Sequence, residues 1–124
     1  MVLIIGGAHQ GKLDYAMETY GLEDQDIHTC TGGEIDFSKR CIYGLETLVL
    51  HCIRQGEDPR AYLQQHRDRW QNSVFICRDI FSGVVPLEGE LRRWRQETGR
   101  LCRFLVGEAN QVSRIFCGLE QRLK

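Results

Sequence analysis

The first apolar segment is a short continuous run over residues 2–5, bounded by Gly6 and Gly7. Such a run is typical of a strand that is buried on both faces of a parallel sheet. Apolar side chains then recur at helical spacing, at Leu13, Ala16, Met17 and Tyr20. Gly21 follows where a helix is expected to end. The chain is therefore predicted to open with a strand, a glycine turn and a helix.

The middle of the chain predicts a second strand and a second helix. Residues 26–30 form the candidate strand. Asp36 or Ser38 is expected to cap the helix, because apolar residues recur on one helical face as far as Gly56. These residues are Ile42, Leu45, Val49 and Cys52.

A third helix is predicted to begin with Asp58 as its N-cap and Pro59 as its first residue. Proline is tolerated at this position because the missing N–H would have had no partner within the helix. This helix is expected to run towards Trp70. The apolar, β-branched residues 73–77 predict another buried strand, and residues 78–86 are predicted to form a loop.

The last third predicts a long amphipathic helix over residues 88–109 and a final strand over 112–117, followed by a short tail. Strands that alternate with helices through short connections favour a parallel sheet between helical layers. The sequence therefore predicts one α/β domain over residues 1–124, with three layers and a mainly parallel sheet.

Composition narrows the class of protein. The chain has 16 basic and 17 acidic residues, so no overall positive field is available to hold nucleic acid or an anionic membrane. No apolar run approaches the ~20 residues of a membrane span, and the N-terminus lacks the basic region of a signal peptide. We expect a cytoplasmic protein that binds any anion locally.

Cysteine and histidine are interpreted as structural. The six cysteines include no Cys-x-x-Cys pair, so reduced core thiols are expected and a metal site is not. His66 is interpreted as a solvated helix residue. His28 and His51 are interpreted as half-buried structural residues.

The motif that can carry chemistry follows the first strand and reads Gly6-Gly7-Ala8-His9-Gln10-Gly11-Lys12. This is the G-x-x-x-x-G-K spacing of a phosphate-binding loop, in which inward N–H groups and a helix N-terminus hold the phosphates of ATP or GTP. Lys12 can reach the β- and γ-phosphates. Leu13 stands where Ser or Thr would bind Mg²⁺, so metal binding is weakened. The alternative is a glycine turn that only joins strand to helix.

Asp79 is the second candidate for chemistry. It follows a buried strand, at the edge where α/β sheets place their ligands. Its carboxylate can hold Mg²⁺ or accept a proton. The alternative is a turn in which the aspartate caps nearby backbone.

Four motifs, in order, resemble the bifunctional adenosylcobinamide kinase/adenosylcobinamide-phosphate guanylyltransferase family. They are the loop above, Asp79-Ile80-x-x-Gly83-Val84-Val85-Pro86, Arg93-Trp94-Arg95-x-x-x-Gly99-Arg100 and Gly118-Leu119-x-x-x-Leu123-Lys124. The resemblance implies a P-loop fold, a homotrimer, and phosphorylation of the aminopropanol hydroxyl of adenosylcobinamide by ATP or GTP. It also implies transfer of GMP through a covalent histidine.

Compared with this family, the chain keeps most of the phosphate loop: Gly6, Gly7, Ala8, Gly11 and Lys12. His9, Gln10 and Leu13 replace Arg, Ser and Ser. Asp79 stands where the family has Glu, so Lys12 and Asp79 are the expected catalytic residues and Asp79 is the expected metal ligand. His66 precedes the strand at 73–77 and does not match the position of the guanylylated histidine, so guanylyl transfer is not expected.

Three functions remain open from the sequence. The chain is a nucleotide-binding enzyme of cobalamin synthesis, a paralogue that binds nucleotide or a protein partner without turnover, or a structural α/β protein whose loop binds nothing. Nucleotide binding is the favoured interpretation.

Overall fold

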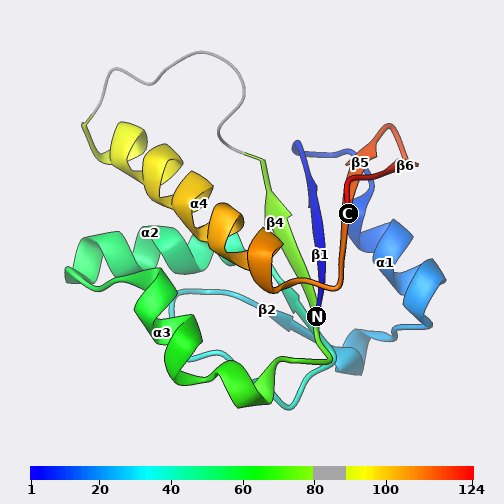
Figure 1. Ribbon diagram of the computed structural model, residues 1–124, viewed down its shortest axis with the longest axis horizontal. Helices are drawn as coiled ribbons and strands as arrows, with labels where there is room; N and C mark the ends of the chain where they lie inside the picture. Colours follow the sequence, from blue (N-terminus) through cyan, green and yellow to red (C-terminus); the bar gives the residue numbers. More distant parts are fainter. Residues whose placement is uncertain (80–88) are drawn as a thin grey trace.

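The strands of the computed structural model, which describes residues 1–79 and 89–124, form one six-stranded sheet (Figure 1). The strands are β1 (Val2–Gly6), β2 (Ile27–Thr29), β3 (Cys41–Tyr43), β4 (Val74–Arg78), β5 (Gln111–Phe116) and β6 (Leu119–Arg122). The α-helices are α1 (Lys12–Tyr20), α2 (Leu45–Gln55), α3 (Pro59–Gln65) and α4 (Gly89–Glu108), and short 3₁₀ turns cover Asp24–Asp26 and Arg67–Arg69.

The strand order is β2-β3-β4-β1-β5-β6, and every pairing is parallel except that of β6 with β5. In the centre, Leu3 of β1 pairs with Phe75 on one side and Val112 on the other. The mainly parallel sheet predicted from the sequence is therefore confirmed. Because β1, β3 and β4 run in the same direction, the loops that follow them meet at one edge, which we call the carboxyl edge.

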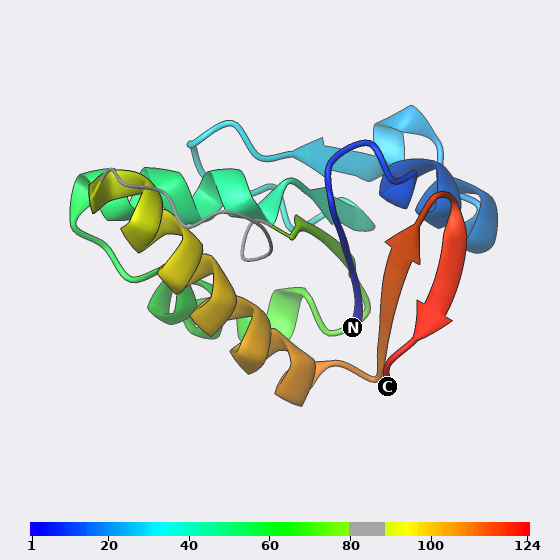
Figure 2. The ribbon, with the colours of Figure 1, turned by 90° about the horizontal axis from the view of Figure 1, so that it is seen from above.

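Helices lie on both faces of the sheet, because successive strand residues point to opposite faces. Leu3 and Phe75 pack in a core with α2, α3 and α4. Ile4 and Ile76 pack in a second core with α1. Figure 2 shows α1 and α4 on opposite sides of the sheet.

The second helix begins later than the sequence predicts. Asp36 caps no helix, since its carboxylate accepts hydrogen bonds from the backbone N–H (3.0 Å) and hydroxyl (2.6 Å) of Ser38. Residues 41–43 form β3 instead, and Gly44, with a φ of 84°, separates this strand from α2. Ile42 matched the helical spacing because its side chain enters the same core as Leu45 of α2.

Two further boundaries differ from the prediction. Asp58 caps α3 as expected, accepting a hydrogen bond from the Arg60 N–H at 3.0 Å, but the helix ends at Gln65 and a 3₁₀ turn leads to Trp70. The predicted tail after residue 117 forms β6. All four residues of β6 are exposed, so no hydrophobic alternation marked it as a strand. The loop predicted over 78–86 lies, beyond Asp79, outside the described residues.

The histidines and cysteines follow their predictions in part. His28 and His51 are half-buried, as predicted. His66 is only partly solvated: it is half-buried, with its ring 5.1 Å from that of Phe37 and 4.9 Å from that of Tyr62. Five cysteines are free and buried, whereas Cys117 is exposed because it lies in the turn between β5 and β6.

No helix within residues 1–79 and 89–124 has the length and apolar character needed to cross a membrane.

Candidate phosphate-binding site

The loop between β1 and α1 lies at the carboxyl edge, and two of its motif glycines have clear structural reasons. A Cβ atom on Gly6 would lie 2.6 Å from the carbonyl oxygen of Ile115, so only glycine allows β1 to approach β5 here. Gly11 precedes α1 with a φ of 88°, a left-handed conformation that favours glycine. The glycine spacing in the sequence therefore reflects what this turn requires.

Lys12 is the first residue of α1, and its side chain folds back across the loop. Its Nζ donates a hydrogen bond to the carbonyl oxygen of Gly7 at 2.6 Å, and the residue is only 7% exposed. Burial lowers the pKa of the Lys12 ammonium, and the negative charge of Glu46 opposes that shift. The amine thus faces its own loop, and an anion can take the place of the carbonyl.

A hollow of about 380 Å³ adjoins the loop and is lined by residues 9–14 and by Tyr43 at the end of β3. Ala8 and His9 are exposed at the bend, where His9 has a φ of 60°. Within the described part of the chain, no acceptor takes a hydrogen bond from the backbone N–H of Ala8, His9 or Gly11. Together with the electropositive N-terminus of α1, these donors suit an anion.

Acidic groups also lie at this edge. The N–H of Asp79 donates to the carbonyl oxygen of Gly6 at 2.7 Å, which places Asp79 beside the start of the loop. The N–H of Arg78 donates to Oε1 of Glu46 at 2.8 Å. Burial and the Arg78 guanidinium act to lower the pKa of Lys12, whereas the negative charges of Glu46 and Asp79 act to raise it. Lys12 therefore lies in the field of two carboxylates.

Glu46 was missed by the sequence analysis. It lies in the first turn of α2, three residues after the end of β3. A carboxylate that closely follows a strand was the sequence feature that could have identified it. That strand had been predicted as helix. Trp94 of α4 donates its indole N–H to the backbone oxygen of Glu46 at 2.7 Å, and its ring lies 6.0 Å from the Arg78 guanidinium. Part of the Arg-Trp-Arg motif thus reaches the candidate site.

The residues fit Mg²⁺ only in part. Among the described residues, no three histidines, cysteines or acidic side chains form a metal-binding group. Leu13 has no ligating oxygen, and it packs against the core on the α1 side of the sheet. Mg²⁺ is commonly held by one or two carboxylates together with substrate phosphates. Asp79 and Glu46 are the carboxylates that would serve in this way beside a bound triphosphate.

The turn between β5 and β6 is fastened to the loop through Gln10. The side-chain Oε1 of Gln10 accepts the N–H of Cys117 at 2.6 Å, and its backbone oxygen accepts the N–H of Gly118 at 2.9 Å. Cys117 and Gly118 have φ values of 51° and 76°, the pattern of a tight two-residue hairpin turn. The turn of the hairpin is therefore held directly against the loop.

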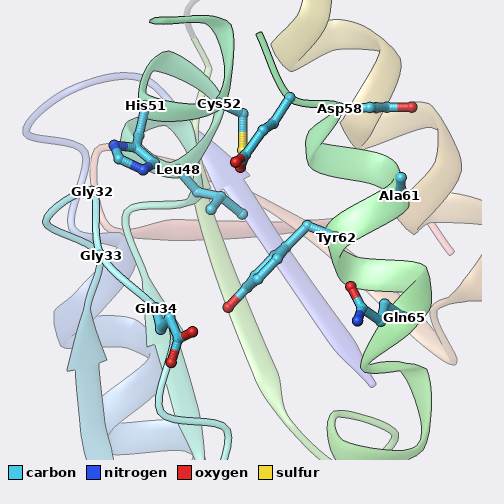
Figure 3. A pocket seen from close by; sticks show the side chains of 11 residues that line it. Gly32, Gly33, Glu34, Leu48, His51, Cys52, Asp58, Ala61, Tyr62 and Gln65 are labelled. Atoms are coloured by element: carbon cyan, nitrogen blue, oxygen red, sulfur yellow. The ribbon is translucent and has the colours of Figure 1, made fainter. Parts of the chain in front are cut away.

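A larger cavity lies elsewhere, between α2, α3 and residues 32–34 (Figure 3). Its volume is about 710 Å³. His51 of α2 faces Gly32, and Tyr62 of α3 points across the cavity, where its hydroxyl accepts the Ile35 N–H at 3.0 Å. The charged residues that line it are acidic: Glu34, Glu57 and Asp58. Since no lysine or arginine among the described residues lines this cavity, it is a poor site for a phosphate.

No protein-family model matches the chain, and no curated protein matches it significantly. What the protein does is therefore inferred from the geometry of its own residues.

Proposed function

We propose that the protein binds ATP or GTP, with the triphosphate held in the loop over residues 6–12. The observation that carries this proposal is the position of Lys12, whose Nζ lies 2.6 Å from the Gly7 carbonyl oxygen inside that loop. A phosphate oxygen is a stronger partner for an ammonium than a carbonyl, because the charged bond is shorter and stronger. The triphosphate would therefore displace the carbonyl and engage the amine.

The topology supports the same site. Ligands of open α/β sheets bind beyond the carboxyl ends of the strands, and the loop follows β1, which lies between β4 and β5. Asp79 follows the neighbouring strand β4 and is bonded to Gly6. One strand thus supplies the cationic loop, and its neighbour supplies a carboxylate.

The resemblance to the adenosylcobinamide kinase family extends the proposal to a reaction. Phosphoryl transfer depends on positioning and on neutralising charge at the phosphates. Lys12 would neutralise charge on the β- and γ-phosphates, and Asp79 would help to hold Mg²⁺, which would supply further positive charge at the phosphates. The acceptor implied by the resemblance is the aminopropanol hydroxyl of adenosylcobinamide, and the assembly it implies is a trimer.

Leu13 favours a second candidate function, nucleotide binding without turnover. Its side chain cannot ligate Mg²⁺ and is half-buried against the core. A site that keeps the phosphate loop but lacks this ligand would bind a nucleotide more readily than it would transfer a phosphoryl group. In that case a protein partner would recognise the nucleotide-bound form of the chain.

Calorimetric titration of ATP and GTP, with and without Mg²⁺, tests the proposal. Lys12→Ala is expected to weaken binding by roughly 10- to 100-fold, because a charge-assisted hydrogen bond is lost. Lys39→Ala is the matched control, since Lys39 also donates its amine to a carbonyl, that of Gln25 at 2.8 Å, away from the loop. Equal affinity of wild type and Lys12→Ala, or no binding at all, would refute the proposal.

Incubation with ATP and adenosylcobinamide then separates the two candidates. Phosphate appearing on the corrinoid supports the kinase. Nucleotide binding with no transfer supports the binding protein. Sedimentation velocity measures whether the implied trimer forms.

A further inference from the structure

The outer strand of the β5–β6 hairpin lies at one edge of the sheet (Figure 2). Among the described residues, no strand pairs with the free side of β6. All four of its residues are exposed. Large apolar side chains are also exposed on this hairpin or directly after it, namely Phe116 (61%), Leu119 (72%) and Leu123 (51%). An exposed strand edge is a template for pairing with another chain.

The hydrogen bonds to β5 show which backbone groups of β6 point outward. In an antiparallel pair, every second residue directs its N–H and C=O groups to the partner strand. The Leu123 N–H donates to the Val112 oxygen at 2.8 Å, and by alternation Gln121 also directs its backbone groups to β5. The backbone groups of Glu120 and Arg122 therefore face the free edge.

The same two residues carry opposite charges on one face of the sheet. Glu120 pairs with Ile115, which packs in the core on the α1 side, so its side chain points to that side. Its carboxylate accepts hydrogen bonds from the Ser113 hydroxyl (2.7 Å) and from Nε of Arg122 (3.0 Å). The Arg122 side chain is still 56% exposed. Because a guanidinium can serve more than one carboxylate, Arg122 can bind a second one.

We propose that two copies of this chain associate through β6, which pairs antiparallel with β6 of the second copy about a two-fold axis at Gln121. In this register Glu120 lies opposite Arg122 of the second copy, and Arg122 lies opposite its Glu120. The backbone groups of these residues face the free edge, so each pair exchanges both of its N–H···O bonds.

Charge selects this register among the neighbouring ones. Moving the two-fold axis to Glu120 or to Arg122 would place that residue opposite its own equivalent, and like charges directly opposite are destabilising. Charged side chains usually protect an edge strand from pairing. Here the two charges are of opposite sign and two residues apart, so an antiparallel copy of the strand is complementary to it.

The register is also matched on the other face of the sheet. Val112 packs in the core on the α2–α4 side, so alternation places Phe116 on that side, together with its paired residue Leu119. In the dimer, Leu119 lies opposite Leu123 of the second copy. Each exposed Phe116–Leu119 pair thus continues into a leucine of the second copy, and these apolar side chains lose contact with water.

A two-fold contact closes on two copies. The inference therefore predicts a dimer, whereas the resemblance to the cobinamide kinase family implies a trimer. The two six-stranded sheets join into one continuous sheet. The contact is short, so the dimer is expected to be weak and to depend on protein concentration. The inference does not rest on nucleotide binding.

Sedimentation velocity at protein concentrations from about 1 to 300 μM tests the association, because this range covers the affinities of small interfaces. Wild type is expected to shift from monomer to dimer across it. Glu120→Arg and Arg122→Glu should each stay monomeric, because each sets like charges opposite one another. Arg114→Glu is the matched control on β5, one strand away from the contact, and should dimerise like wild type. Circular dichroism checks that each variant is folded.

An equimolar mixture of the Glu120→Arg and Arg122→Glu variants tests the register. Within each variant the two charges of β6 have the same sign, so neither variant regains its own ion pair. Between the two variants, position 120 of one meets position 122 of the other with opposite charge. We therefore expect the mixture to form a heterodimer although each variant alone is monomeric.

Hydrogen exchange measured by NMR tests the same contact in wild type without any substitution. The amide protons of Glu120 and Arg122 are expected to exchange at least ~10-fold more slowly at high protein concentration than at low, because they become hydrogen-bonded only in the dimer. The amide proton of Gln121 is the internal control, since it faces β5 in both states. Equal exchange of Glu120 and Arg122 at both concentrations would overturn the proposal.

The sedimentation results can overturn it as well. Wild type that stays monomeric throughout, or that forms a trimer, excludes the two-fold pairing. A dimer that persists in Glu120→Arg and Arg122→Glu forms through another surface, and its loss in Phe116→Ala would assign it to the apolar face of the hairpin. A mixture that stays monomeric shows that the proposed register is wrong.

Discussion

Two of the hollows among the described residues differ in size and in chemistry, and the smaller one is the better suited to an anion. The hollow at the loop over residues 6–12 measures about 380 Å³ and is lined by residues 9–14, Lys12 among them, and by Tyr43. The cavity between α2 and α3 measures about 710 Å³, and the charged residues that line it are acidic. The smaller hollow therefore has the chemistry for an anion.

The two regions also differ in how strongly the backbone restricts the residues that line them, and volume does not reveal this difference. At the loop, Gly6 must be glycine because β5 lies too close for a side chain, and Gly11 favours glycine because its φ is left-handed. Substitution at either position would disturb this turn. At the larger cavity, a Cβ atom on Gly33 would meet nothing within 4 Å. Gly33 therefore tolerates a side chain, whereas Gly32 beside it, with a φ of 100°, resembles Gly6 and Gly11 of the loop in not doing so.

Thiol reactivity should give the largest contrast between the two regions. Cys52 lines the larger cavity but is only 1% exposed, and burial, together with the charges of Glu57 and Asp58, raises its pKa to about 11. Cys117 is exposed on the turn beside the loop. We expect Cys117 to react with an aromatic disulfide reagent at least ~1,000-fold faster than the buried thiols, which require structural opening.

The measurement is the number of fast-reacting thiols by absorbance. One fast thiol is expected in wild type and in Cys52→Ser, and none in Cys117→Ser. Two or more fast thiols in wild type would show that the larger cavity opens readily and would weaken the contrast.

Gly6→Ala should give the next largest effect, this time on stability. The added Cβ would lie 2.6 Å from the Ile115 carbonyl oxygen, which is backbone and cannot move alone. We expect the free energy of unfolding to fall by about 3 kcal/mol, as overpacking typically costs about 1–3 kcal/mol. Gly33→Ala, in the wall of the larger cavity, should change it by less than about 0.5 kcal/mol.

Urea unfolding followed by circular dichroism measures both variants. Equal stability of the two would mean that β1 can shift away from β5 at no cost, and the structural reason given for Gly6 would be wrong.

Leu13→Ser should have the smallest effect of the three, and that effect should be confined to Mg²⁺-dependent binding. It restores the hydroxyl that a phosphate loop uses to bind Mg²⁺. The quantity compared is the ratio of ATP affinity with Mg²⁺ to ATP affinity without it. We expect this ratio to be roughly 3 to 10 times larger in the variant than in wild type, the scale of one added metal ligand or hydrogen bond. Leu13→Ala is the matched control, because it removes the same apolar packing without adding an oxygen. Equal Mg²⁺ effects in the two variants would indicate a loop that no longer positions a metal.

The sequence predicted those parts of the site that depend on neighbouring residues. Gly6, Gly11 and Lys12 lie within one turn of chain between a strand and a helix, and local pattern was enough to place them. Glu46 was not found, because β3 has three residues and its Ile42 also matched the spacing of the following helix. The contact between Arg78 and Glu46 joins residues far apart in the chain.

The β5–β6 hairpin was missed for a different reason. The residues of β6 are exposed on both faces, so the sequence shows no alternation of hydrophobic and polar residues there that would indicate a strand. Its hydrogen bonds to β5, and those of the turn to Gln10, are tertiary contacts. The larger cavity was likewise invisible, since it arises where residues 32–34 meet α2 and α3.

By itself, the sequence determined the α/β class, the mainly parallel sheet and the position of the glycine loop between β1 and α1. Those features follow from apolar runs, helical spacing and the conformational demands of glycine, all of which act over a few residues. Only the tertiary structure decided that Glu46 and Asp79 flank Lys12, that Gln10 is fastened to the hairpin, and that Phe116 and Leu119 stand exposed on the hairpin. The physical reason is that sheet order brings distant strand ends to one edge, and no local pattern encodes which ends will meet.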